Sequence, residues 1–203
     1  MPSSIDFDCL DSTNSEAWRQ IDRGLVHHGW AIQAKQQTAG RGQRGHTWVS
    51  DWGGLYLSVV LEPNVAVSRA EEFTLWSAWA IAKAINLYLP QPLVKLKWRN
   101  DLLIYDQKLG GILVETRCQG TQIKYAVIGV GINYENAVPE GAIALQQVVP
   151  HQISSLSQLS QIAHQAILQG YDYWRNAGMT EVLASYSVSA KMGGQEQKKW
   201  RSP

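Results

Sequence analysis

The sequence of 203 residues contains only two cysteines, and it lacks both long apolar runs and an excess of charge of either sign. Cys9 and Cys118 have no CxxC spacing, which excludes a disulfide framework and a cysteine zinc site. No apolar run comes near the ~20 residues that a membrane-spanning helix needs. The N-terminus carries Asp6 and lacks the basic and apolar segments of a signal peptide. We therefore expect a cytoplasmic protein with no membrane partner.

The charge balance argues against a non-specific nucleic-acid binder. The 18 basic and 17 acidic side chains give a formal net charge of +1, whereas such binders normally carry a surplus of Lys and Arg. The 45% hydrophobic content is typical of a folded globular chain. The nine tryptophans are better explained by bulky core packing than by stacking on a flat ligand.

Periodicity and turn residues predict helices around a mainly antiparallel sheet. Capping boxes at Thr13 with Glu16 and at Ser68 with Glu71 predict helices that end near residue 23 and before Pro90. Residues 152–177 and 180–187 are predicted as two further helices. The expected strands cover residues 29–34, 55–61, 93–98, 102–105, 108–117 and 122–132.

These elements define the fold class and the domain. Residues 55–61 are apolar on both faces, which predicts a central strand covered on both sides. The last four strands have connections too short for parallel crossovers, so they form an antiparallel meander. The prediction is an α+β fold with a mixed, mainly antiparallel sheet packed with helices. One domain is expected over residues 1–188, followed by a disordered tail over residues 189–203, which have no apolar pattern.

The segment from Gln37 to Trp48 is the most informative part of the sequence. It reads QTAGRGQRGHTW, and its glycines let backbone amides approach a ligand while Arg41 and Arg44 offer planar groups that fit carboxylate or phosphate. It lacks the Gly-Lys-Ser/Thr of a Walker loop and the strand–GxGxxG–helix context of a dinucleotide site. A flexible solvated loop is the alternative interpretation.

Two further segments carry charged residues or glycines where a sheet meets a cleft. Lys97, Asp101, Lys108 and Glu115 border short apolar strands, an arrangement that suits phosphate and Mg²⁺. Asn100 and Asp101 also suit a simple turn. The glycines of the strand GVGIN at residues 129–133 mark either close approach of a ligand or a bulge. The histidines show no metal spacing and neither cysteine neighbours a base, so no metal ligand and no thiol nucleophile are assigned.

In this order, the segments resemble the catalytic domain of biotin protein ligases. The matching pieces are Asp11–Asn14, QTAGRGxRG from Gln37, KWxNDL from Lys97, KLxGILVE from Lys108 and GxGIN from Gly129. The resemblance runs from about residue 6 to about residue 176. It implies the biotin–lipoate ligase catalytic fold, which is related to class II aminoacyl-tRNA synthetases.

The resemblance implies a two-step reaction. Biotin and ATP, with Mg²⁺, form biotinyl-5′-AMP, and the biotinyl group then passes to a lysine of the biotin carboxyl carrier protein of acetyl-CoA carboxylase. The implied catalytic residues are Arg41, Lys108 and Asp101. The implied biotin-binding residues are Ser12, Thr13, Asn14, Gln37, Gly40, Arg41, Gly42, Lys108, Gly129 and Gly131. The implied nucleotide-binding residues are Gly42, Gln43, Arg44, Trp48, Asn100 and Asn133.

The sequence departs from the family pattern at several points. Gln43 and His46 replace two arginines of the family's loop, which reduces the positive charge around the adenylate. Arg99 replaces the usual proline of KWPND. The family's C-terminal β-barrel and N-terminal helix-turn-helix have no counterpart here, so we expect no DNA binding, and either a monomer or a homodimer. A lipoate-type ligase and a non-catalytic binder of biotin or adenylate remain the alternatives.

Overall fold

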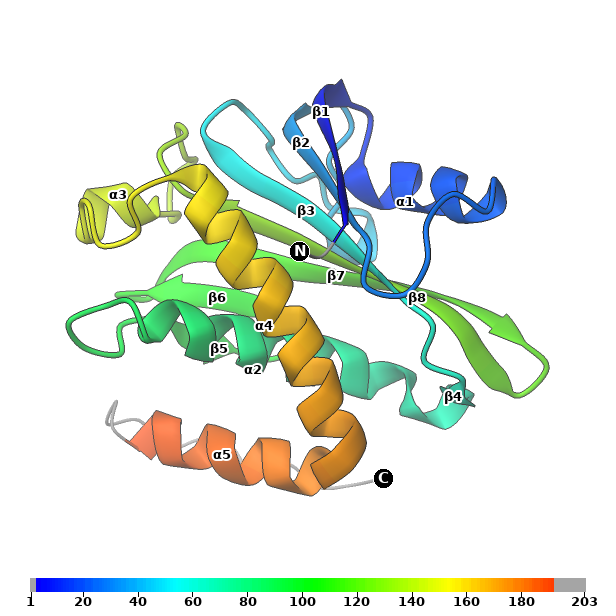
Figure 1. Ribbon diagram of the computed structural model, residues 1–203. Helices are drawn as coiled ribbons and strands as arrows, with labels where there is room; N and C mark the ends of the chain where they lie inside the picture. Colours follow the sequence, from blue (N-terminus) through cyan, green and yellow to red (C-terminus); the bar gives the residue numbers. More distant parts are fainter. Residues whose placement is uncertain (1–2, 192–203) are drawn as a thin grey trace.

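One sheet of eight strands organises the computed structural model, which describes residues 3–191 (Figure 1). Its strand order is β1-β2-β3-β8-β7-β6-β5, with β4 paired to β8 outside this path. Strands β1 and β2 are parallel and all other pairs are antiparallel, which confirms the predicted fold class. The strands are β1 (Ser4–Leu10), β2 (Ala31–Gln37), β3 (Gly54–Leu61), β4 (Val65–Ala66), β5 (Lys95–Lys97), β6 (Asp101–Ile104), β7 (Gln107–Gln119) and β8 (Gln122–Asn133).

Helices cover the two faces of the sheet unequally. Helices α2 (Ala70–Asn86) and α4 (Leu156–Ala177) pack on the face that carries Leu55, Leu57 and Val59, and they form the main core (Figure 1). Helix α1 (Thr13–Asp22) packs in a second cluster with Ile32, Val60 and Val127, which face the opposite way because side chains alternate along a strand. The remaining helices are α3 (Leu145–Val148) and α5 (Met179–Lys191), and 3₁₀ turns occupy Gln43–Gly45 and Val67–Arg69.

Strand β3 and the meander agree with the sequence. All eight residues of β3 are buried, as expected for a strand covered on both sides, and Ser58 is its single polar side chain apart from the Tyr56 hydroxyl. Strands β5 to β8 form the predicted antiparallel meander. Tyr105 and Asp106 join β6 to β7 with φ of 50° and 64°, the backbone of a type I′ hairpin turn.

Both capping boxes were wrong. Helix α1 begins at Thr13, so its N-cap is Ser12, which makes no side-chain cap bond. The Thr13 hydroxyl bonds Gln37 and the Glu16 carboxylate bonds Arg19. Helix α2 begins at Ala70 after a 3₁₀ turn, so Ser68 is not its cap.

Some element boundaries also differ from the prediction. Helix α2 ends at Asn86, before Pro90 as predicted, whereas other elements differ. Strands β1 and β4 and helix α3 were not predicted. Helix α5 continues to Lys191, past the domain boundary proposed at residue 188, and the rest of the predicted tail, residues 192–203, lies outside the described residues.

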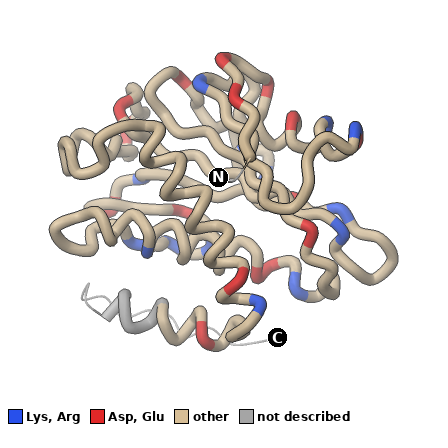
Figure 2. The backbone as a smooth tube through the Cα atoms, in the orientation of Figure 1, with Lys and Arg blue, Asp and Glu red and all other residues tan. Residues whose placement is uncertain are grey.

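Charged residues of both signs are interspersed along the backbone, in keeping with the small net charge (Figure 2). Within residues 3–191, no helix combines the length and apolar character needed to cross a membrane.

Helix α4 carries a histidine that makes the fold sensitive to acid. The His164 ring is buried, Nε2 lies 2.8 Å from the Gly29 carbonyl oxygen, and burial lowers the pKa of the imidazole below 6.5. The unfolded chain therefore binds a proton first as the pH falls, so the free energy of unfolding is highest above about pH 6.5 and decreases below it. Urea unfolding at pH 7.5, 6.5 and 5.5 measures this, and His164→Gln, which keeps a donor but does not titrate, should flatten the dependence. An unchanged pH slope in that variant would contradict the assignment.

Candidate active site

A cavity of about 700 Å³ opens on the face of the sheet that carries α1. The start of α1, the loop after β2, the turn between β5 and β6, and strands β7 and β8 all contribute to its walls. Fourteen of the predicted site residues line it: Ser12, Thr13, Asn14, Gln37, Arg41, Gly42, Gln43, Arg44, Trp48, Asn100, Asp101, Lys108, Gly129 and Gly131. Five segments that are distant in the sequence therefore meet at one site.

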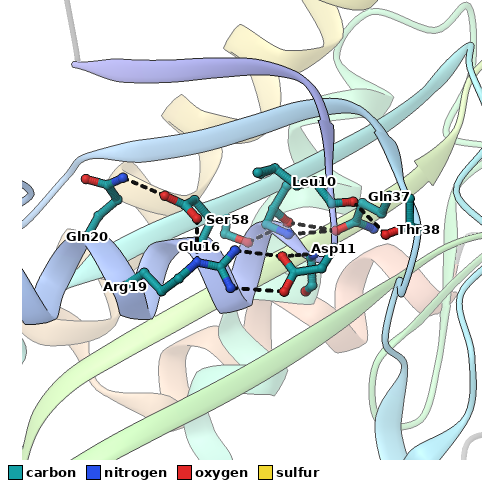
Figure 3. Close-up of polar contacts among 10 residues, drawn as sticks. Leu10, Asp11, Glu16, Arg19, Gln20, Gln37, Thr38 and Ser58 are labelled. Carbon is teal, nitrogen blue, oxygen red and sulfur yellow. Dashed lines mark hydrogen bonds and ion pairs between the residues drawn. The ribbon is translucent and has the colours of Figure 1, made fainter.

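Neutral hydrogen-bonding groups form one wall, at the start of α1 (Figure 3). Gln37 Oε1 accepts from the Thr13 backbone N–H at 2.8 Å and from its hydroxyl at 3.2 Å, and Gln37 Nε2 donates to Ser50 Oγ at 2.8 Å. The buried Ser58 hydroxyl lies 2.8 Å from Thr13 Oγ1 and donates to Asn14 Oδ1 at 2.6 Å. Each of these side chains is held by another, so the wall is formed before any ligand binds.

An ion-pair network fixes this wall from outside the cavity. Arg19 contacts both carboxylate oxygens of Asp11, at 2.9 and 2.7 Å, and also contacts Glu16 at 2.6 Å (Figure 3). The hydrogen bonds from Arg19 lower the pKa of Asp11 to about 2. The strand end that carries Asp11 is thereby tied to the first turns of α1.

The glycines of β8 form the floor of the cavity. A Cβ at Gly129 would overlap Asn14 Oδ1 and lie 3.0 Å from the Leu113 carbonyl, and a Cβ at Gly131 would lie 2.7 Å from the Trp48 indole. The pairing of β8 with β3 stays in register through both positions, so the bulge interpretation was wrong and close approach explains these glycines.

The Trp48 indole lies over the floor between the two ends of the cavity. Its Nε1 is buried and has no hydrogen-bond partner among the described residues. The Lys108 ammonium lies 5.4 Å from the centre of the ring system. Gly111 faces the same group, since a Cβ there would lie 3.7 to 3.8 Å from Trp48, Lys108 and Asp101. The floor therefore leads from Asn14, past Trp48, to Lys108.

The charged side chains that line the cavity are mostly cationic. Arg41, Arg44, Arg99 and Lys108 line it, against one carboxylate, Asp101. This local excess contrasts with the near-neutral chain. Among the described residues, no group of three or more His, Cys, Asp and Glu side chains is arranged to hold a metal ion.

Lys108 is oriented by its own backbone and by one carboxylate. Its ammonium lies 2.8 Å from Asp101 Oδ1. Its N–H donates to the Gly141 carbonyl at 2.9 Å, and its carbonyl accepts from the Ile143 N–H at 3.0 Å and from Asn133 Nδ2 at 3.3 Å. The chain segment after β8 thus holds Lys108 at the cavity wall.

Arg41 is paired with Glu115, which the sequence analysis grouped with Lys97, Asp101 and Lys108 as suited to phosphate and Mg²⁺; neither Glu115 nor Lys97 lines the cavity. The Arg41 guanidinium contacts both carboxylate oxygens of Glu115, at 2.9 and 3.0 Å. Glu115 Oε2 also accepts from Asn14 Nδ2 at 3.0 Å and from Trp18 Nε1 at 3.1 Å. One carboxylate outside the cavity therefore connects the loop to the polar wall.

The loop closes on itself over the cavity. The Gly42 N–H donates to the His46 carbonyl at 2.6 Å, and the Trp48 N–H donates to the Gly40 carbonyl at 2.9 Å. Between them Arg44 adopts the left-handed region, with φ 57° and ψ 31°. It lines the cavity and makes no side-chain hydrogen bond or ion pair with the described part of the chain.

Two predicted residues, Gly40 and Asn133, do not line the cavity. A Cβ at Gly40 would overlap the Ser50 hydroxyl and the Trp48 carbonyl, so this glycine permits the loop to close. Asn133 is buried and bonds the Lys108 carbonyl and Asn136, which makes it a support for Lys108. The sequence analysis assigned no ligand to eight further lining residues: His46, Thr47, Trp98, Arg99, Gly111, Ile112, Leu113 and Val130. Most of them lie within or beside the quoted motifs, so their proximity to a motif is the feature of the sequence that could have identified them as site residues.

Comparisons with known proteins identify the family of the chain. The model of the biotin/lipoate A/B protein ligase family matches residues 7–133. A biotin–[acetyl-CoA-carboxylase] ligase of Paracoccus denitrificans is 34% identical over 134 residues, covering 66% of this chain and 55% of the relative. The bifunctional ligase/repressor BirA of Escherichia coli is 37% identical over 145 residues, covering 68% of this chain and 44% of the relative.

A solved structure shows the same fold at low identity. The biotin protein ligase of Leishmania major in complex with biotinyl-5-AMP superposes with a TM-score of 0.78 at 22% identity, covering 100% of this chain and 87% of the other. The chain spans about half the length of the curated relatives that it matches.

Proposed function

Because the chain belongs to the biotin/lipoate A/B protein ligase family, we propose that it is an ATP-dependent biotin protein ligase. It would form biotinyl-5′-AMP from biotin and ATP, and then transfer biotin to a lysine of a biotin carboxyl carrier protein, as the names of its relatives suggest. The observation that carries the proposal is the cavity itself, in which a glycine floor connects a neutral polar wall to a cationic one. Biotin matches this pattern, with a neutral ureido ring at one end and a carboxylate at the other.

The polar wall would bind the ureido ring. Ser12, Thr13, Asn14 and Gln37 supply hydroxyl and amide groups, and Gly129 and Gly131 leave room for Asn14 and Trp48, which would flank the bicyclic ring. Arg41, with Gly42 beside it in the cavity lining, would hold the carboxylate. Arg41 would then divide its hydrogen bonds between the ligand and Glu115.

In the first step, a carboxylate oxygen of biotin attacks the α-phosphorus of ATP. The new bond joins the acyl oxygen to this phosphorus, and the bond to the bridging oxygen of the β-phosphate breaks, so pyrophosphate leaves with the electron pair. No proton has to move, but two anions must meet, and Lys108 would neutralise the charge that develops around the α-phosphate. Gly42, Gln43, Arg44, Trp48 and Asn100 would surround the nucleotide, with Asn133 supporting Lys108.

The Mg²⁺ ion that the first step would need can enter the cavity bound to ATP. Mg²⁺ is usually held by one or two carboxylates together with substrate phosphates. Asp101 is the one carboxylate among the described residues that line the cavity, and it is paired with Lys108. We therefore treat Mg²⁺ as part of the Mg–ATP substrate.

In the second step, the ε-amine of the carrier lysine attacks the acyl carbon of the adenylate. A carbon–nitrogen bond forms, the bond between the acyl carbon and the phosphate oxygen breaks, AMP leaves as an anion, and the proton that the amine loses passes to solvent water. Asp101, at the cavity wall, would orient the incoming amine. The expected location of this reaction is the cytoplasm.

Biotin-dependent exchange of radiolabelled pyrophosphate into ATP tests the first step. We expect exchange with Mg²⁺ that requires biotin and is not supported by lipoate. Exchange with lipoate instead would indicate the lipoate-type alternative. No exchange, with biotin still bound in calorimetry, would indicate a non-catalytic binder.

Gln43→Arg should slow the release of biotinyl-5′-AMP. Gln43 lines the cavity and reaches the Ile112 carbonyl at 3.5 Å, so an arginine there would add a charged donor beside the adenylate phosphate. We expect roughly tenfold slower dissociation, equivalent to ~1.4 kcal/mol. Stopped-flow measurement of adenylate release checks this, with Gln43→Met as the size-matched neutral control. Equal rates in both variants would show that charge at this position does not matter.

A further inference from the structure

Three of the four cations that line the cavity are paired with carboxylates, and for two of them the carboxylate is mostly buried. Arg41 contacts Glu115 at 2.9 and 3.0 Å, and Lys108 contacts Asp101 at 2.8 Å. The triphosphate of ATP carries a larger negative charge than these partly compensated groups can offset. The proposed reaction therefore needs further cations near the phosphates that leave.

Arg99 is a cation whose present partner lies on the surface. It lines the cavity from the turn between β5 and β6, and its NH1 contacts Glu71 Oε1 at 3.2 Å. The Glu71 side chain is 82% exposed, so this pair is weak and screened by water. A phosphate that is held in the cavity can replace Glu71 at little cost.

Arg99 and Arg44 flank the same point of the cavity wall. The Ile112 carbonyl on β7 accepts from Asn100 Nδ2 at 3.2 Å and from Gln43 Nε2 at 3.5 Å. The loop after β2 and the turn after β5 therefore converge on one oxygen atom. Arg99 directly precedes Asn100 and Arg44 directly follows Gln43, and both arginines line the cavity.

We propose that Arg99, together with Arg44, binds the β- and γ-phosphates of ATP and stabilises pyrophosphate as it leaves. This inference rests on the proposed ligase function and adds a phosphate-binding residue that the motif does not carry, since Arg99 occupies the position where the family pattern has proline. It supplies positive charge from the wall opposite the loop, in which Gln43 and His46 have replaced arginines. Because pyrophosphate is absent from the second step, Arg99 acts on the first step alone.

The test compares Arg99→Gln with Arg99→Lys and Glu71→Gln. For Arg99→Gln we expect the KM for ATP and the KM for pyrophosphate in the exchange reaction to rise roughly tenfold. The Kd for biotin and the single-turnover transfer from purified biotinyl-5′-AMP to the carrier lysine should stay within about twofold. Arg99→Lys should recover part of the loss. Glu71→Gln should leave the KM for ATP unchanged or lower it, because it frees Arg99 from its surface partner.

The outcomes separate this inference from the function on which it rests. Absence of exchange in the unmodified protein overturns both. Normal exchange with an unchanged KM for ATP in Arg99→Gln overturns the inference alone. The inference also fails if Glu71→Gln matches Arg99→Gln, since the pair would then serve only to tie the turn to α2, and thermal unfolding of both variants would show the same loss.

Discussion

Lys108→Ala is expected to reduce biotin-dependent ATP–pyrophosphate exchange by about 100- to 1000-fold, the cost of removing one preorganised donor from a developing anion. The ammonium lies at the cavity wall, 2.8 Å from Asp101 Oδ1, and its backbone is held by three hydrogen bonds from other segments. Truncating the side chain therefore removes the charge without displacing the strand. Because the Lys108 and Asp101 side chains are 39% and 24% exposed, the ion pair contributes at most ~1 kcal/mol to stability.

Two measurements separate a catalytic role for Lys108 from a structural one. Urea unfolding should give nearly the same free energy for Lys108→Ala and the unmodified protein. Lys95→Ala, which removes an exposed lysine from β5 outside the cavity, should leave both exchange and stability unchanged. If Lys108→Ala lost stability in proportion to activity, Lys108 would be a structural residue and the assignment would be wrong.

Gly129→Ala is expected to weaken biotin binding by at least tenfold. The added Cβ would overlap Asn14 Oδ1 and lie 3.0 Å from the Leu113 carbonyl, which belongs to a central strand and cannot move away. Asn14 would have to turn from Ser58 and Glu115, so the polar wall would lose its arrangement. The overpacked site should also lower the free energy of unfolding by ~1–3 kcal/mol. Isothermal calorimetry with biotin and urea unfolding measure the two effects.

The control for Gly129→Ala is a glycine outside the cavity whose substitution by alanine should also lower the stability of the fold. Gly120 has a φ of +60° in the turn between β7 and β8, and a Cβ there would meet open space. Gly120→Ala should cost ~1–2 kcal/mol through its left-handed backbone, with biotin affinity unchanged. If Gly129→Ala does not fold, Gly131→Ala is the second variant, since its close neighbour is the Trp48 side chain. Unchanged affinity in the folded variant would remove β8 from the biotin site.

The sequence predicted best those parts of the fold that depend on short-range patterns. The doubly apolar β3 and the short turns of the meander follow from local periodicity, and the structure confirms both. Strand β1 was missed although Ile5, Phe7 and Cys9 alternate with polar residues, a signal that was present. The first capping box failed because its side chains bond elsewhere: Thr13 bonds Gln37 at the end of β2, and Glu16 bonds Arg19 one turn along the same helix.

The site was predictable where motifs carry it and hidden where contacts depend on the folded sheet. Fourteen motif residues meet at the cavity, although the first and the last of them, Ser12 and Gly131, are more than 100 residues apart in the chain. The role of Glu115, which joins Arg41 to Asn14 and Trp18, depends on how β7 lies beside α1 and the loop. No spacing in the sequence indicates such a contact.

The cavity combines parts of unequal local stability. Its floor belongs to β8, which is hydrogen-bonded on both sides, to β3 and to β7, so those amides can open to solvent only when the sheet as a whole unfolds. The loop after β2, which covers the cavity, is held by a few hydrogen bonds, among them those of Gly42 and Trp48, and can open without the rest of the domain. Substrates can thus enter and leave through fluctuations of the cover, while the surface that positions them keeps the rigidity of the whole domain.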